Sequence, residues 1–129
     1  MPGGHTEQQI ERPMADNPLM RANAFVRHAE VRLHCARVSE YEVKQLASDL
    51  EAIAAERFGR IVLDLSQVAL VTSAGVSMLI QLHKSCGACG GRMVLFGLND
   101  DLVRMLKIAG LLKLLSVEKD RARAVKRVL

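Results

Sequence analysis

The sequence predicts an α/β domain with a partly parallel sheet. Short runs rich in Ile, Val and Leu alternate with segments whose apolar residues recur every three or four positions, which is typical of strand–helix units. The chain has 129 residues, enough for one domain with its own core. Hydrophobic residues make up 50% of it and charged residues 25%, as in ordinary soluble globular proteins.

The first part of the chain differs from the rest. All three prolines and Gly3-Gly4 lie here, and no periodic apolar pattern is present. We therefore expect a disordered tail over residues 1–23 and a folded domain over residues 24–129. In this domain Phe25-Val26 is expected to form a short first strand, and the alternation in Glu30–Cys35 predicts a second one.

The first helix is predicted to begin after Ser39. With Glu42 three positions later, Ser39 matches a capping box, in which the glutamate side chain reaches back to the backbone of the capping residue. Apolar residues at helical spacing follow, and Gly59 is a suitable stop. The next segment, Arg60–Leu65, is rich in β-branched residues and predicts a buried strand.

The pattern changes from strand to helix at Thr72-Ser73-Ala74-Gly75. Apolar and small residues recur at helical spacing after it, and Gly87, Gly90 and Gly91 end the helix. Two hydroxyl groups therefore stand at a predicted helix N-terminus. Unpaired N–H groups and the positive end of the helix dipole favour an anion at such a position.

Four further elements complete the predicted domain. They are a strand over Arg92–Phe96, a short helix with Asn99 as its N-cap and Gly110 as its stop, a strand over Leu114–Val117 and a terminal helix over Lys119–Leu129. The terminal helix is expected to place Ala122, Val125 and Leu129 on its apolar side and basic residues on the other.

Four segments carry a resemblance to a known family: Asp64-Leu65-Ser66-Gln67-Val68, Thr72-Ser73-Ala74-Gly75-Val76, Gly90-Gly91-Arg92-Met93-Val94-Leu95 and Leu106-Lys107-Ile108-Ala109-Gly110-Leu111. In order and spacing they resemble the STAS domain family, specifically the small bacterial anti-sigma factor antagonists. The resemblance runs from about Phe25 to the C-terminus. It implies a single STAS-like domain with a mixed, partly parallel sheet of about four to five strands and helices packed mainly on one side.

The resemblance also implies a phosphorylation switch. The family's phosphorylated serine corresponds to Ser73, and Thr72, which replaces the family's Asp, is the alternative. In these antagonists the unphosphorylated protein binds an anti-sigma factor that is also a serine kinase using ATP and magnesium. Phosphorylation breaks the complex and a PP2C-type phosphatase resets it. Nucleotide and metal belong to the kinase, so the chain is expected to be no enzyme and to need no catalytic residue, metal site or cofactor.

The docking surface implied by the family combines the serine loop with the loop before the first helix. Its residues here are Ser39, Thr72, Ser73, Ala74, Gly75 and Val76. Before the first helix the family carries Gly-Glu-Leu-Asp, whereas this chain has Ala36-Arg37-Val38-Ser39. Two acidic groups are replaced, so the partner is expected to differ in charge from the usual one. A phosphate here would add about −1.5 to −2 charges.

Several alternatives remain open from the residues themselves. Ser73 or Thr72 could simply cap the helix, an interaction that stabilises by about 1 kcal/mol. A nucleophilic serine is not favoured, because no Gly-x-Ser-x-Gly elbow is present. Cys86 and Cys89 have C-x-x-C spacing, which would suit zinc or redox chemistry, but their place near a helix end favours packed thiols. The alternative function is a STAS binding module that is never phosphorylated and serves as a scaffold or transport-complex subunit.

Composition and charge limit the remaining classes. The net charge of +4 comes from scattered residues, and with one Tyr and no Trp the chain lacks the aromatic platforms that favour nucleic-acid binding. No apolar run approaches the ~18 residues of a membrane-spanning helix. The polar first ten residues do not match a signal peptide. We therefore expect a cytoplasmic protein without a membrane span.

Overall fold

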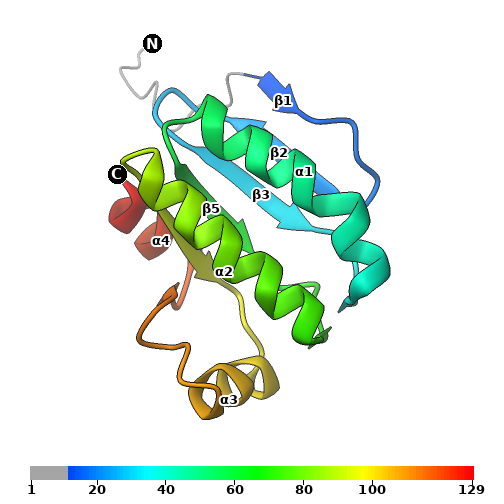
Figure 1. Cartoon of the computed structure of the whole chain (residues 1–129). Helices are drawn as coiled ribbons and strands as arrows, with labels where there is room; N and C mark the ends of the chain where they lie inside the picture. Colours follow the sequence, from blue (N-terminus) through cyan, green and yellow to red (C-terminus); the bar gives the residue numbers. More distant parts are fainter. Residues whose placement is uncertain (1–11) are drawn as a thin grey trace.

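The computed structural model describes residues 12–129, and a six-stranded sheet lies at its centre (Figure 1). The strands follow the order β1-β2-β3-β5-β7-β8 across this sheet, and β4 and β6 form a separate pair. In chain order the elements are β1 (Arg12–Met14), β2 (Met20–Ala24), β3 (Ala29–Leu33), β4 (Arg37–Val38), α1 (Glu40–Glu56), β5 (Arg60–Asp64), β6 (Leu70–Val71), α2 (Ser73–Ala88), β7 (Arg92–Phe96), α3 (Asp100–Ile108), β8 (Ser116–Glu118) and α4 (Arg121–Val128).

The main sheet is mixed. β1, β2 and β3 pair in antiparallel fashion, whereas β3, β5, β7 and β8 run parallel. The predicted α/β class and mixed sheet are confirmed, with six strands in place of the expected four to five. Because parallel strands end at the same edge of a sheet, the segments that follow β3, β5 and β7 emerge together there.

Helices cover the two faces of the sheet unequally. α1 and α2 lie side by side over one face, and α4 lies on the other face over β5 and β7 (Figure 1). The large core lies beneath the α1–α2 pair, where Leu46, Leu50 and Leu82 are fully buried. A second, small cluster lies beneath α4 and consists of Val62, Val94, Ala124 and Val128. The first face therefore holds most of the buried apolar area.

The apolar side of α4 differs from the predicted one. Ala124 and Val128 are buried and Val125 is half-buried, whereas Ala122 and Leu129 are exposed. Both stripes have helical spacing, so the α4 sequence is compatible with either. Contact with β5 and β7 fixes the rotation of the helix about its axis and so selects the stripe that is buried.

The expected disordered tail over residues 1–23 is wrong from Arg12 onward, because β1 and β2 occupy this stretch. Phe25-Val26, expected as a strand, lies in the β2–β3 hairpin turn, where the Phe25 N–H donates to the His28 carbonyl at 2.8 Å. The two strands bury mainly Met and Ala side chains, which carry little strand signal. Residues 1–11 of the expected tail lie outside the described residues.

Helix starts that were predicted from capping residues are confirmed. Glu42 Oε1 accepts the N–H of Ser39 at 2.9 Å at the start of α1, and Asn99 Oδ1 accepts the N–H of Leu102 at 2.7 Å at the start of α3. β7 has the predicted bounds, whereas β8 lies slightly later than the predicted Leu114–Val117. Among the helices within residues 12–129, none combines the length and apolarity needed to cross a membrane.

Candidate functional site

The candidate site lies where the N-termini of α1 and α2 meet. β4 and β6 pair in parallel with Val38 opposite Val71, and each strand leads directly into a helix. The residue after each strand is the N-cap of the following helix, Ser39 for α1 and Thr72 for α2. The structure therefore brings together two segments that stand more than thirty positions apart in the chain. Two-residue strands carry almost no sequence signal, so the β4–β6 pairing was not predicted, although the family resemblance implied that the two loops share one surface.

Ser73 is the first residue of α2 and is exposed. Its hydroxyl makes no hydrogen bond with any residue in the described range 12–129. Within the same range, the Thr72 side chain accepts no N–H of the first turn, and that turn contains no acidic residue. Free N–H groups and the positive end of the helix dipole thus lie beside an accessible hydroxyl.

Thr72 has a different environment. Its side chain is half-buried, and both its N–H and its Oγ1 hydroxyl donate to the carbonyl of Val38, at 3.0 and 3.3 Å. Thr72 therefore occupies the N-cap position but fastens the start of α2 to β4 instead of capping the helix with its side chain. Of the two neighbouring hydroxyls, that of Ser73 is the accessible one.

Gly75 lies beneath the Ser73 loop, where the start of α2 packs on β4 and β6. It is buried, and a Cβ atom added to it would lie 2.6 Å from the Val38 carbonyl oxygen and 2.6 Å from Val71 Cγ1. Only glycine lets α2 pack this closely on β4 and β6. Gly75 was expected on the docking surface, but its burial gives it a supporting place under Ser73. Ala74 and Val76 are half-buried.

The α1 side of the site carries the neighbouring charges. Glu42 Oε1 accepts the Ser39 N–H at 2.9 Å and the Ser39 hydroxyl at 2.5 Å. These hydrogen bonds, from the hydroxyl first and the backbone second, lower the pKa of Glu42. Arg37 is exposed on β4 opposite Leu70, an apolar side chain that is 48% exposed. The α1 side of the site thus presents the cation Arg37 and the apolar side chain of Leu70, while the carboxylate of Glu42 is already hydrogen-bonded to Ser39.

Asp64 and His83 are residue types that could assist a serine nucleophile, but neither is hydrogen-bonded to Ser73. Asp64 lies at the end of β5, where its two carboxylate oxygens accept the Ser66 N–H at 2.8 Å and Arg32 Nε at 2.9 Å. His83 stands ten residues after Ser73 on α2, roughly 15 Å along the helix. The geometry provides no hydrogen-bonded base for a serine nucleophile within residues 12–129.

The C-x-x-C pair lies at the far end of α2. Cys86 is buried in the core, and burial raises the pKa of its thiol to about 12. Cys89 is exposed at the C-cap of the helix. Because a nucleophilic or metal-binding cysteine acts as a thiolate, the environment of Cys86 suits a packed thiol.

Residues 32–124 match the sequence model of the STAS domain. The chain belongs to the STAS domain family. The match takes in β4, β6 and the start of α2, so the candidate site lies inside the matched part of the chain. The predicted family is therefore confirmed.

Solved structures share the fold of this STAS domain. An anti-sigma-factor antagonist (STAS) domain protein from Planctomyces limnophilus is similar with a TM-score of 0.74 and 18% identity, over 84% of this chain and 97% of that one. The phosphorylated form of the Bacillus cell fate determinant SpoIIAA has a TM-score of 0.65 and 17% identity, over 85% and 99% of the two chains. The murine solute carrier 26 family member A9, an anion transporter, has a TM-score of 0.65 and 15% identity, over 95% of this chain but 22% of that one. At such identities the likeness concerns the fold alone.

Proposed function

We propose that this STAS domain is an anti-sigma factor antagonist whose partner binding is switched by phosphorylation of Ser73. The observation that carries the proposal is the accessible, unbonded hydroxyl of Ser73 at the start of α2, beside the N-terminus of α1. The likeness to antagonist structures, one of them in a phosphorylated form, supports it. The half-buried Thr72 hydroxyl, held on the Val38 carbonyl, is the less suitable acceptor.

The proposed switch acts on the surface and leaves the fold unchanged. A phosphate on Ser73 could accept the free N–H groups of the first turn of α2, where the helix dipole tolerates its charge. The packing of Gly75 and the hydrogen bonds of Thr72 would hold the loop in place. A partner docked on the neutral loop would then meet a bulky dianion and dissociate by repulsion and desolvation.

In this proposal the partner is an anti-sigma factor that is also a serine kinase, and it supplies the ATP and magnesium. A PP2C-type phosphatase would remove the phosphate, and the cycle would run in the cytoplasm. The docking surface would comprise Ser39, Thr72, Ser73, Ala74 and Val76, with Arg37 and Leu70 at its rim. Arg37 stands where the family carries Glu, so a matched partner should place a carboxylate opposite it.

A second candidate function is a STAS module that is never phosphorylated. The likeness to part of a much longer anion transporter chain favours this reading, because there a domain of the same fold is one portion of a larger protein. Such a module would bind a fixed partner as a scaffold or transport-complex subunit. Thr72 in place of the family's Asp, which removes a charge beside Ser73, is compatible with it.

The deciding experiment incubates the purified chain with the candidate kinase from the same genome, ATP and magnesium. Mass spectrometry then locates any phosphate in the wild type, in Ser73→Ala and in Thr72→Val. Ser77→Ala is the matched control, since Ser77 is also on α2, one turn later. We expect phosphate on Ser73, none in Ser73→Ala, and loss of kinase binding on phosphorylation.

Other outcomes separate the alternatives. Phosphate on Thr72 would keep the pathway and move the site. Tight binding of the partner with no phosphate on either residue would reject the switch and favour the constitutive module. Phosphate lost equally in Ser73→Ala and Ser77→Ala would contradict a specific site.

A further inference from the structure

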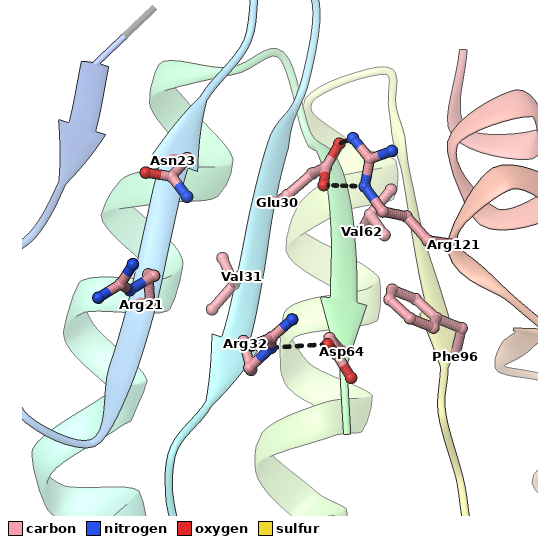
Figure 2. A pocket seen from close by; sticks show the side chains of 9 residues that line it. All are labelled: Arg21, Asn23, Glu30, Val31, Arg32, Val62, Asp64, Phe96 and Arg121. Carbon is pink, nitrogen blue, oxygen red and sulfur yellow. Dashed lines mark hydrogen bonds and ion pairs between the residues drawn. The ribbon is translucent and has the colours of Figure 1, made fainter. Parts of the chain in front are cut away.

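α4 leaves part of its face of the sheet uncovered, and a cavity of about 360 Å³ lies there (Figure 2). The open part consists of β2 and β3, while α4 covers β5 and β7. The cavity lies on the opposite side of the sheet from α1 and α2. It is therefore separate from the Ser73 loop, and binding there can be measured apart from the proposed switch.

Two arginines on the cavity wall occupy opposite positions on neighbouring strands. Arg21 on β2 and Arg32 on β3 are paired residues in the antiparallel ladder, so their side chains project from the same face. Both are exposed. Like charges directly opposite one another destabilise a sheet. Asp64 offsets the charge of Arg32, so the partner that is still missing is one for Arg21.

The carboxylates nearby are already engaged. Glu30 accepts Arg121 Nε and Nη2, each at 2.6 Å, and also the Nε2–H of His28 at 2.9 Å. Asp64 accepts Arg32 Nε and the Ser66 N–H. Arg21 has neither an ion pair nor a hydrogen bond among the described residues. Three arginines against two carboxylates leave one positive charge on the cavity wall.

The same cavity has an apolar side. Val62 and the half-buried ring of Phe96 line it across from the arginine pair (Figure 2). Asn23, next to Arg21 on the same face of β2, adds an amide without a partner in the described residues. A cationic pair, one amide and an apolar wall match a ligand with an anionic head and an apolar body.

We propose that this cavity binds a small organic anion, with its carboxylate or phosphate held between Arg21 and Arg32 and its apolar part against Val62 and Phe96. The volume suits a molecule of roughly one ring with its head group, near the lower end of ordinary ligand sites. Guanidinium groups present paired N–H donors that match both carboxylate and phosphate. The bound anion supplies the partner that Arg21 lacks among the described residues.

The test measures binding of phenyl phosphate, phenylacetate and inorganic phosphate by calorimetry and by backbone amide shifts. Arg21→Gln is the main variant, because it removes a charge without breaking an ion pair of the described residues. Arg104→Gln, an exposed arginine on α3, is the control. We expect saturable binding of at least one aromatic probe, weakened by about tenfold or more in Arg21→Gln and unchanged in Arg104→Gln. Amide shifts should centre on β2, β3 and the end of β5.

The two aromatic probes distinguish the head groups. Tighter phenyl phosphate assigns a phosphate ligand and tighter phenylacetate assigns a carboxylate. Inorganic phosphate alone should bind more weakly than phenyl phosphate, because it lacks the apolar contact. Absence of saturable binding of both aromatic probes at millimolar concentration would overturn the proposal, as would equal weakening in Arg21→Gln and Arg104→Gln.

A second measurement tests the repulsion itself. Without ligand, Arg21→Gln should have a higher Tm than the wild type, because the like-charge pair is gone. With a bound probe the wild-type Tm should rise, and that of the variant should rise less at the same probe concentration. An unchanged or lower Tm of the free variant would contradict the excess positive charge at Arg21 on which the site is built.

Discussion

Gly75 is the residue on which the geometry of the Ser73 loop depends. A methyl group there would meet the Val38 carbonyl and the Val71 side chain at 2.6 Å. The Val38 carbonyl also holds Thr72, so it cannot move without loosening the start of α2. A side chain added at the buried Gly75 is therefore expected to displace the start of α2 and with it the exposed Ser73 hydroxyl.

Gly75→Ala should lower the free energy of unfolding by about 1–3 kcal/mol, the range for overpacking a tight interior. Gly87→Ala is the matched control on the same helix, where an added Cβ meets nothing within 4 Å. It should raise stability by about 0.5–1 kcal/mol, since alanine is the better helix former. Urea denaturation measures both. Stabilisation by both substitutions would show that α2 has room at Gly75.

At the scale of elements, α4 is fastened to the β2–β3 hairpin by side chains at its first turn. Arg121 makes two hydrogen bonds to Glu30, and its guanidinium carbon lies 5.8 Å from the centre of the Phe25 ring. Phe25 stacks on the fully buried His28, with ring centres 4.8 Å apart, and His28 donates to the same Glu30. These contacts of Arg121, Glu30, Phe25 and His28 therefore help the small apolar cluster to hold α4 on the sheet.

Arg121→Gln should loosen α4. It leaves Glu30, whose side chain is 16% exposed, without its charged partner, while Arg121 itself is 51% exposed. The expected loss is about 1–2 kcal/mol, below that of a fully buried pair because solvent screens Arg121. Amide hydrogen exchange in α4 should speed up. Arg123→Gln, which breaks an exposed pair with Asp120, should change stability by less than about 0.5 kcal/mol. Equal effects of the two substitutions would show that the Arg121–Glu30 contact stabilises the protein no more than an exposed ion pair.

The sequence predicted the elements that carry their own signals and missed those that depend on partners. Capping residues such as Ser39 and Asn99 located helix starts, and β-branched runs located β5 and β7. β1 and β2 were missed because their inward residues are Met and Ala. The buried stripe of α4 was misassigned because rotation of a helix is decided by what it packs on.

In the candidate site, too, some features follow from the local sequence and others depend on contacts with distant parts of the chain. The position of Ser73 at a helix start followed from local pattern and family resemblance. The buried role of Gly75 required the approach of β4, which belongs to another part of the chain. Likewise, the Arg21–Arg32 pair exists only through the register of β2 against β3. No local pattern contains that register.

For the whole molecule, two partly buried carboxylates make stability depend on pH. Burial raises the pKa of Asp64, but hydrogen bonds from Ser66 and Arg32 outweigh it, so that the pKa lies below its ordinary value. Burial likewise raises the pKa of Glu30, and hydrogen bonds from His28 and Arg121 outweigh that effect. A lowered pKa in the folded state stabilises above the ordinary carboxyl range, and this stabilisation is lost as the pH falls through the folded-state value.

We therefore expect the free energy of unfolding to fall as the pH drops from neutral through the carboxyl range. Asp64→Asn and Glu30→Gln should each start from a lower stability at pH 7 and show a shallower decline. Urea denaturation at successive pH values measures the slopes. Asp101→Asn, an exposed carboxylate on α3, serves as the comparison for a charge removed at the surface. Slopes equal to that of the wild type in both test variants would place the acid sensitivity elsewhere.

Within the described residues, the sheet ends on both sides in three-residue strands, β1 and β8, and β1 contains Pro13. A proline has no N–H to donate, and so short a ladder offers few backbone groups to another chain. Edge-to-edge growth into larger aggregates is thereby discouraged. A partner would therefore have to be recognised by side chains and helix ends, and not by extension of the sheet. A single covalent modification can change the chemistry of side chains and helix ends. Extension of a sheet, in contrast, depends little on sequence.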